Sequence, residues 1–169
     1  DNAGRTSDAL RTIRRATEAS SEPLPRDLVG IVARAASKFE TADDAFALLE
    51  GPLGADGVDA LYDLSEDKSA PASTTARAKA SLNKPAVRAK ASPSTLLLID
   101  LSSASTCERR KEILERSGEH ADARALPLLQ PLKSTKGCGR RGRSDCHRCL
   151  RGDDTLDRAI RAAEAHGAR

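Results

Sequence analysis

The sequence is short of aromatic residues. Among 169 residues it has two phenylalanines and one tyrosine, and it has no tryptophan and no methionine. A hydrophobic core must therefore be built from Leu, Ile, Val and Ala. These side chains suit closely packed helices better than a β-sandwich, in which aromatic and β-branched residues are preferred. No stretch alternates polar and apolar residues for long enough to form a strand, so we expect an all-α fold.

Long hydrophobic runs and catalytic motifs are missing as well. The longest aliphatic run covers residues 96–99, whereas a membrane span needs about 18 apolar residues. The sequence contains no paired catalytic carboxylates, no phosphate-cradling glycine motif, no His-Glu metal helix and no nucleophile elbow. We therefore expect neither a membrane segment nor an enzyme.

Charges of the two signs nearly cancel over the whole chain, with 28 Lys and Arg against 25 Asp and Glu. The informative feature is the local clustering of basic residues near the C-terminus. The length fits one domain, or one domain with a tail. Because the chain begins at Asp1 without a methionine, we expect a processed protein or a piece of a longer one.

Hydrophobic periodicity predicts four helices in the first part of the chain. After a leader over residues 1–6, Ser7 can cap the first helix, and two prolines within residues 20–25 end it. Residues 41–44 (TADD) resemble a capping box for a short helix, and a fourth helix follows and ends around residues 65–67. The clearest amphipathic stripe belongs to the second helix, over residues 26–39, and consists of Leu28, Ile31, Val32, Ala35, Ala36 and Phe39.

The second part of the chain begins with a less regular segment. Residues 66–94 are rich in Ala, Ser and Lys and predict two short helices, basic on one face. The helix that starts at Pro93 is apolar nearly all round, so we expect it at the buried centre. Residues 105–108 (STCE) form a capping box with Ser105 as the cap of the next helix, which ends at Gly118. Helices over 121–132 and 153–167 complete a single helical domain over residues 7–169.

Residues 113–132 (ILERSGEHADARALPLLQPL) resemble a HEAT repeat, in which an outer helix and a short turn precede an inner helix. Asp122 can cap the inner helix, and Pro127 can bend it. The resemblance implies a HEAT-like α-solenoid, a stack of helix pairs that binds partners, most often proteins. An irregular helical bundle is the other all-α architecture open to this chain. The matching positions are Asp122, Arg124, Ala125, Leu126, Pro127 and Leu129.

Residues 133–152 form a loop of Cys, Gly and Arg that lies outside the HEAT pattern. It holds Cys138, Cys146 and Cys149, and Cys107 lies about thirty residues upstream. Each of its glycines at 137, 139 and 142 would cost about 1 kcal/mol in a helix relative to alanine. Backbone propensity therefore does not order this loop, and the cysteines are the candidates that do.

Structural disulfides are our first hypothesis for the four cysteines. An even count favours an extracytoplasmic or secreted protein, and closing such loops typically stabilises a small protein by about 2–4 kcal/mol. We expect Cys107 to pair with either cysteine of the C-x2-C pair, Cys146 or Cys149. The remaining two cysteines would then close the glycine turn and staple the C-terminal loop.

Zinc and thiol redox chemistry are the alternatives. A tetrahedral zinc site would gather Cys138, Cys146 and Cys149 with Cys107 or His147. We expect His147 to face solvent rather than complete such a site. The C-x-x-C motif at residues 146–149 has cationic neighbours that favour a thiolate. The redox families with this motif set it against a βαβ sheet, however, and this chain shows no strands.

The basic residues of the loop predict a binding surface. The loop has no aromatic side chain to stack on a nucleobase, and acidic residues follow it directly. We therefore expect a non-catalytic protein-interaction or scaffold module without a cofactor, whose partner is another protein or the rest of a longer parent chain. The alternative is a zinc-stabilised module that contacts nucleic acid or another polyanion through the loop. The third hypothesis is a C-x-x-C thiol-redox protein. The basic set is Lys133, Lys136, Arg140, Arg141, Arg143, Arg148 and Arg151.

Overall fold

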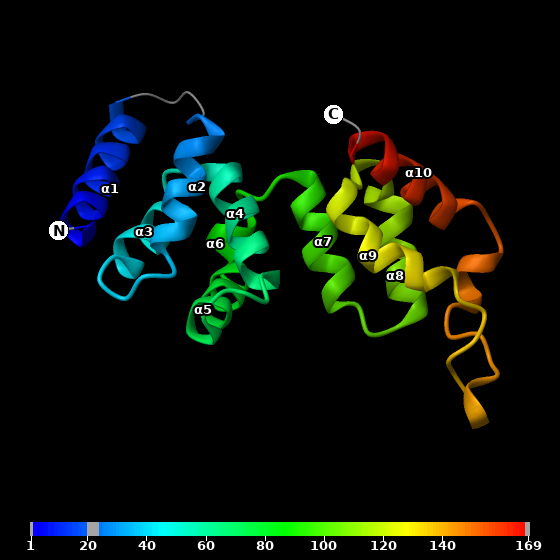
Figure 1. Cartoon of the computed structure of the whole chain (residues 1–169). Helices are drawn as coiled ribbons and strands as arrows, with labels where there is room; N and C mark the ends of the chain where they lie inside the picture. Colours follow the sequence, from blue (N-terminus) through cyan, green and yellow to red (C-terminus); the bar gives the residue numbers. More distant parts are fainter. Residues whose placement is uncertain (1, 20–23, 168–169) are drawn as a thin grey trace. The chain divides into compact units, whose positions relative to one another are not determined.

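The computed structural model describes residues 2–19 and 24–167 and confirms the all-α prediction (Figure 1). Within these residues no strand forms, and the β-type pairing consists of an isolated bridge between Cys138 and Ser144. The chain divides into two compact units, Asp1–Ser92 and Pro93–Arg169. The sequence predicts one domain over residues 7–169, whereas in the structure a second unit begins at Pro93, the first residue of a new helix.

The first unit consists of six helices. They are α1 (Asn2–Ala19), α2 (Arg26–Ala35), α3 (Ala42–Glu50), α4 (Gly54–Glu66), α5 (Ala72–Leu82) and α6 (Pro85–Arg88). Helix α4 packs against α2, α3 and α5. A Cβ atom at Gly57 would collide with the carbonyl oxygen of Leu49, so glycine lets α4 pass close to the end of α3. Fully buried side chains at this centre include Val32, Phe46, Leu48, Leu49, Val58 and Leu61.

The first helix is longer than predicted. It begins at Asn2, so residues 2–6 are helical rather than a leader before a helix capped at Ser7. Once a helix is nucleated, each further residue adds one hydrogen bond at a smaller entropic loss than the first turn required, which favours this extension. Most of the break predicted at residues 20–25 lies outside the described residues, and α2 begins directly after it at Arg26.

The second helix is shorter than predicted, and Phe39 does not belong to its buried stripe. Helix α2 ends at Ala35, and the side chain of Phe39 is 96% exposed. The buried hydroxyl of Thr41 donates a hydrogen bond of 2.9 Å to the carbonyl oxygen of Ala35. The same carbonyl accepts the Lys38 amide at 3.1 Å, so the end of α2 is closed by a tight turn and by the Thr41 hydroxyl together. The Thr41 hydroxyl is thus directed to the end of α2 and makes no side-chain cap of α3.

Polar contacts hold the Ala/Ser/Lys-rich segment to α3. Glu50 accepts hydrogen bonds from Ser81 at 2.5 Å and from Lys84 at 2.7 Å. The ammonium group of Lys90 donates to the backbone carbonyls of Glu50 and Gly51, at the C-terminal end of α3. Cations at a helix C-terminus are favourable because the carbonyls there carry partial negative charge. The two predicted short helices thus correspond to α5 and α6, and their basic residues meet acceptors within the first unit.

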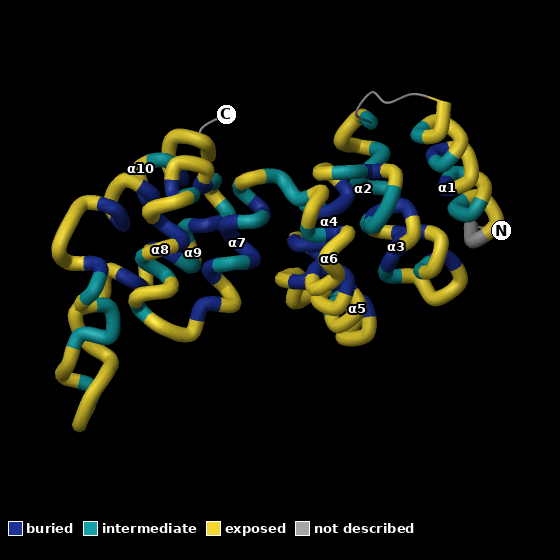
Figure 2. Tube along the Cα trace, turned by 180° about the vertical axis from the view of Figure 1, so that it is seen from behind, coloured by how far each residue is buried: buried dark blue, intermediate teal, exposed yellow. Residues whose placement is uncertain are grey.

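The second unit starts with α7 (Pro93–Ser103) and α8 (Cys107–Ser117) and ends with α10 (Thr155–Gly167). Leu97, Leu98 and Ile113 are buried among them, and Figure 2 shows the middle of α7 buried, as its apolar sequence predicts. Between α8 and α10 lie the short helices η1 (Gly118–His120), η2 (Ala123–Ala125), α9 (Leu126–Leu129), η3 (Gln130–Lys133), η4 (Arg140–Gly142) and η5 (Arg148–Arg151).

Two predictions for the second unit need correction. The cap of α8 is Thr106, whose hydroxyl accepts the Arg109 amide at 3.2 Å, and not Ser105. The helix predicted over residues 121–132 is divided into η2, α9 and η3, because Pro127 and Pro131 lack the amide hydrogens that a continuous helix needs.

The predicted cap at Asp122 is confirmed. Its carboxylate accepts a hydrogen bond of 2.9 Å from the Arg124 amide. The Arg124 guanidinium group returns to the same carboxylate at 2.8 Å and also reaches the Thr95 hydroxyl in α7 at 3.1 Å. Burial on its own would raise the pKa of Asp122, but the hydrogen bonds and charge of Arg124 lower it below its usual value. The pair therefore fixes η2 against the start of α7.

Candidate functional site

Within the Cys, Gly and Arg loop, residues 137–146 form a short hairpin, which we call the arginine hairpin. Cys138 and Ser144 exchange two backbone hydrogen bonds of 2.9 Å, and the Gly137 amide donates to the Gly142 carbonyl at 2.9 Å. Gly139 and Gly142 have φ values of 71° and 65°, a region that glycine occupies without strain. The hairpin projects from the second unit and is largely exposed (Figures 1 and 2).

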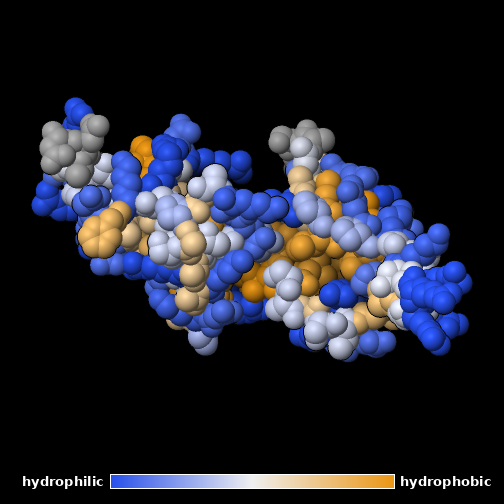
Figure 3. All heavy atoms as spheres, turned by 60° about the horizontal axis from the view of Figure 1, so that its bottom comes forward, coloured by the Kyte–Doolittle hydropathy of each residue, from blue (hydrophilic) through white to orange (hydrophobic). Residues whose placement is uncertain are grey.

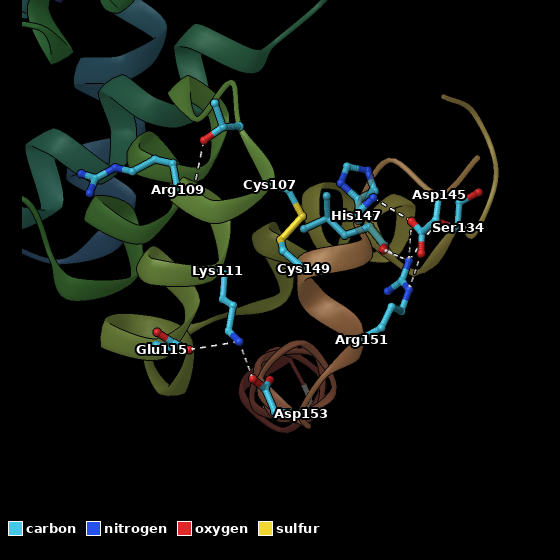
Figure 4. Close-up of a disulfide and its surroundings, with 12 residues drawn as sticks. Cys107, Arg109, Lys111, Glu115, Ser134, Asp145, His147, Cys149, Arg151 and Asp153 are labelled. Carbon is cyan, nitrogen blue, oxygen red and sulfur yellow. Dashed lines mark hydrogen bonds and ion pairs between the residues drawn. A yellow bond between two sulfur atoms is a disulfide. The ribbon is translucent and has the colours of Figure 1, made fainter. Parts of the chain in front are cut away.

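Two disulfides fix this region, as our first hypothesis predicts. Cys107 pairs with Cys149, with the two Cα atoms 6.0 Å apart, and Cys138 pairs with Cys146, with a Cα–Cα distance of 5.0 Å. The first bond joins the start of α8 to η5, as Figure 4 shows, and the second closes the hairpin. The expected arrangement is confirmed, and it selects Cys149 as the partner of Cys107.

The two bonds close loops of very different length. The sequence separations are 42 residues for Cys107–Cys149 and 8 for Cys138–Cys146. Loop-closure entropy assigns about 4 kcal/mol to the longer loop and about 2.5 kcal/mol to the shorter one. The longer bond therefore stabilises the fold of the second unit, whereas the shorter bond mainly defines the shape of the hairpin.

Arg151 forms the base of the hairpin. Its guanidinium group lies 2.9 Å from the carboxylate of Asp145 and donates to the carbonyl oxygens of Leu132 and Ser134 at 2.8 and 2.9 Å (Figure 4). Asp145 also accepts the His147 amide at 2.7 Å. The hydrogen bond from His147, followed by those from Arg151, lowers the pKa of Asp145. Arg151 thus positions the hairpin and is not part of its open basic surface.

The other predicted basic residues fall into two groups. Lys133 forms an ion pair with Asp157 at 3.2 Å. The remaining five, all exposed, have no carboxylate partner within residues 2–19 and 24–167. Figure 3 shows hydrophilic atoms gathered at the end of the second unit that carries the hairpin. These five cations are Lys136, Arg140, Arg141, Arg143 and Arg148.

His147 lies in a different environment from the predicted one. It is half-buried rather than directed to solvent, and its Nδ1 atom is buried without a hydrogen-bond partner among the described residues. Burial, and secondly the positive charge of Arg110, lower the pKa of the imidazole. The ring is therefore neutral near pH 7 and adds no charge to the hairpin.

The cysteine pairing bears directly on the two alternative chemistries. All four sulfur atoms are in disulfides, so none carries the thiolate that zinc ligation requires in this oxidised form. No group of three or more His, Cys, Asp or Glu in the part of the chain that the structure describes could hold a metal ion. Cys146 and Cys149 belong to different disulfides, so the C-x-x-C motif does not close on itself.

Sequence reasoning identified the cysteines and the cations but missed the roles of Asp145 and Arg151. Asp145 was visible as the one acidic residue of the stretch 133–151. Its isolation among seven cations was the available signal that it neutralises one of them. The acceptors on Leu132 and Ser134 are backbone carbonyls, which no sequence pattern marks.

Comparison with known proteins adds no functional assignment. No protein-family model, curated protein or solved structure matches the chain. None of the helices in the described ranges is both long enough and apolar enough to cross a membrane. The site must therefore be interpreted from its own geometry.

Proposed function

We propose that this chain is a non-catalytic protein-interaction module, in which a HEAT-like helical scaffold presents the arginine hairpin to an acidic segment of a partner protein. The observation that carries the proposal is the combination of five cations that pair with no carboxylate among the described residues with a loop held in one shape by a disulfide, a backbone ladder and the Arg151 contacts. The two disulfides also fit an oxidising, extracytoplasmic setting.

Pre-organisation makes the hairpin suitable for binding. A flexible loop loses conformational entropy when it is ordered on a partner, and a loop that is already fixed avoids most of that loss. The guanidinium groups of Arg140, Arg141 and Arg143 can each bind a carboxylate through two parallel hydrogen bonds. No acceptor within the described chain competes for them, in contrast to Arg77 and Lys84 of the first unit, which pair with Asp43 and Glu50.

The expected strength of this contact is modest. An exposed ion pair contributes about 0.2–1 kcal/mol, so five such pairs supply about 1–5 kcal/mol. An affinity of 1 μM corresponds to about 8 kcal/mol. The hairpin on its own therefore gives a weak contact that depends strongly on salt, and the helical faces must supply the rest of a tight complex.

The HEAT-like part of the proposal is supported by the segment from α8 to η3. Helix α8 serves as the outer element, and the inner element follows the turn at Asp122, whose carboxylate caps η2 and pairs with Arg124. The inner element is divided into η2, α9 and η3 at Pro127 and Pro131, so it departs from the single bent helix that the resemblance implies. Stacked helix pairs of this kind expose elongated surfaces that bind other proteins.

Nucleic acid is the second candidate, and the same five cations favour it. Phosphates attract arginine as carboxylates do. The hairpin contains no aromatic side chain on which a base could stack, however, and stacking contributes about 1–3 kcal/mol per base in single-strand binders. The acidic protein segment therefore remains the favoured ligand.

The proposal is tested with a fluorescently labelled oligoglutamate peptide, whose binding is followed by anisotropy at low and physiological salt. A hairpin variant with Arg140→Gln, Arg141→Gln and Arg143→Gln should bind about tenfold more weakly at low salt, from about 0.5 kcal/mol for each lost pair. The matched control also removes three arginines of the second unit, all of them ion-paired, and should lose much less affinity: Arg109→Gln, Arg116→Gln and Arg158→Gln.

Equal losses in the two triple variants would mean that net charge alone attracts the peptide, and the proposal would fail. A labelled single-stranded DNA serves as the competing ligand. If DNA binds more tightly than the peptide, and only the hairpin variant loses that binding, the nucleic-acid alternative replaces the protein partner.

A further inference from the structure

The geometry points to Cys138 as a thiol–disulfide exchange site, at which small thiols and dithiols open the hairpin bond while Cys107–Cys149 stays closed. Cys138 is exposed, whereas Cys146, Cys107 and Cys149 are half-buried. Exchange requires in-line approach of a thiolate to a disulfide sulfur, so access to that sulfur controls the rate. Among the four paired sulfurs, the one on Cys138 belongs to the most exposed residue.

The environment of Cys146 favours the same direction of attack. A Cβ atom built on Gly137 would lie only 3.3 Å from the Cys146 sulfur, so the backbone of Gly137 covers one side of that atom. Arg148 follows Cys146 by two residues, and Arg143 precedes it by three. Positive charge stabilises a thiolate and makes it a better leaving group. The exposed sulfur is therefore attacked, and the covered sulfur leaves.

The chemistry is a balanced two-electron exchange. The thiolate of a small dithiol bonds to the Cys138 sulfur, the Cys138–Cys146 bond breaks, and Cys146 leaves as a thiolate that takes up a proton from water. The second thiolate of the dithiol then attacks its own sulfur in the mixed disulfide. Cys138 is released as a thiol, and the dithiol is oxidised to its cyclic disulfide. A monothiol stops at the mixed disulfide on Cys138 until a second molecule reacts.

The other disulfide is protected by its position. Cys149 lies in η5 next to Leu150, which is 3% exposed, and Cys107 is the first residue of α8. A helix N-terminus favours a cysteine thiolate, so Cys107 would be a good leaving group once Cys149 was attacked. Limited access to the half-buried sulfurs, rather than their leaving-group quality, is what keeps this bond closed.

Opening the hairpin bond would regulate binding, a consequence that rests on the proposed function. Without the disulfide, residues 137–146 keep their shape through a few backbone hydrogen bonds and the contact of Asp145 with Arg151 at the base, and the tip loses its covalent closure. The cations would then occupy many conformations, and binding to the acidic peptide would weaken. The exchange chemistry itself does not depend on the identity of the ligand.

The experiment treats the native, oxidised protein with graded amounts of dithiothreitol, blocks free thiols with iodoacetamide, and locates the labels by peptide mass mapping. We expect Cys138 and Cys146 to be labelled at least about ten times faster than Cys107 and Cys149. With glutathione as the thiol, the mixed disulfide should lie on Cys138 and not on Cys146. Labelling of all four cysteines at one rate, or of Cys107 and Cys149 first, would overturn the inference.

Comparison of one double variant with the parent protein tests whether limited access protects the Cys107–Cys149 bond. In the Cys138→Ser/Cys146→Ser variant, the Cys107–Cys149 bond should remain as resistant to dithiothreitol as in the parent protein. Rapid reduction of the Cys107–Cys149 bond in the variant would show that its own limited access does not protect it, and would contradict the inference.

The same samples distinguish this inference from the proposed function. If the labelling order is as expected but the oxidised protein does not bind the acidic peptide, the exchange site stands and the proposed function fails. If the oxidised protein binds the peptide but all four cysteines react together, the exchange site fails and the proposed function stands.

Discussion

Removal of each disulfide separately gives the sharpest test of how the second unit is stabilised. The two bonds close loops with separations of 42 and 8 residues. Loop-closure entropy predicts a loss of unfolding free energy of about 4 kcal/mol for Cys107→Ser/Cys149→Ser and about 2.5 kcal/mol for Cys138→Ser/Cys146→Ser. The difference, about 1.5 kcal/mol, depends only on the ratio of the two loop lengths. This difference therefore depends on fewer assumptions than either separate loss.

The measurement is urea denaturation followed by far-UV circular dichroism, with the parent protein fully oxidised. Linear extrapolation gives the unfolding free energy of each variant, and comparable slopes would show that the unfolded states expose similar surface. Because α8 and η5 are joined by the longer bond, its loss should also loosen the packing of α10, which contacts α8. If the hairpin variant is as destabilised as the Cys107/Cys149 variant, or more so, the assignment of separate roles to the two bonds is refuted.

Three further predictions concern single side chains. The two phenylalanines form a matched pair: Phe46→Ala should lower the unfolding free energy by about 3–5 kcal/mol, whereas Phe39→Ala should change it by less than about 0.5 kcal/mol, as denaturant melts will show; similar values would contradict their placement. Thr106→Ala should lower the stability by about 1 kcal/mol through loss of the helix cap, and Ser105→Ala should leave the melting temperature unchanged; the reverse order would restore the sequence-predicted cap. Asp122 has a folded-state pKa below its unfolded value of about 3.9, so its contribution to stability is complete above that value and is lost as the pH falls through the folded pKa. Asp122→Asn should therefore reduce the loss of stability between neutral and strongly acidic pH in urea melts, and an unchanged pH profile would show that the Arg124 contact does not shift this carboxyl group.

Much of the fold follows from patterns that act locally. The terminal helix was predicted at residues 153–167 and is observed at Thr155–Gly167, with Leu156, Ile160 and Ala163 buried at helical spacing. Asp153 caps it by accepting the Thr155 amide at 3.0 Å. Capping residues and a 3.6-residue period depend only on neighbours in sequence, and for that reason they are readable in advance.

Helix ends that depend on the choice between competing side-chain hydrogen bonds were not predictable in this way. The periodicity of α2 continues numerically to Phe39, but the Lys38 amide and the Thr41 hydroxyl both donate to the carbonyl of Ala35, where the helix ends. At α8 the sequence offers two adjacent hydroxyls, on Ser105 and Thr106. In the structure the Thr106 hydroxyl accepts the Arg109 amide, one residue later than the pattern places the cap.

In the candidate site, too, features set by local sequence were predictable and features set by tertiary contacts were not. Cysteine spacing and glycine content predicted a loop closed by disulfides. They left open whether Cys107 pairs with Cys146 or with Cys149. The role of Arg151 depends on carbonyl oxygens 17 and 19 residues earlier in the chain. By composition Arg151 is one more positive charge, whereas in the folded protein its Nε and Nη2 atoms donate to Asp145 and to two backbone carbonyls, and it positions the other cations.

The central claim is that the arginine hairpin is the surface that meets an acidic partner segment. It is tested most directly by titrating an oligoglutamate peptide into ¹⁵N-labelled, oxidised protein and mapping the amide chemical-shift changes. The largest changes should fall within residues 136–148 and disappear in the Arg140→Gln/Arg141→Gln/Arg143→Gln variant. Shifts centred on the helices of the first unit, or an unchanged hairpin at saturating peptide, would contradict it.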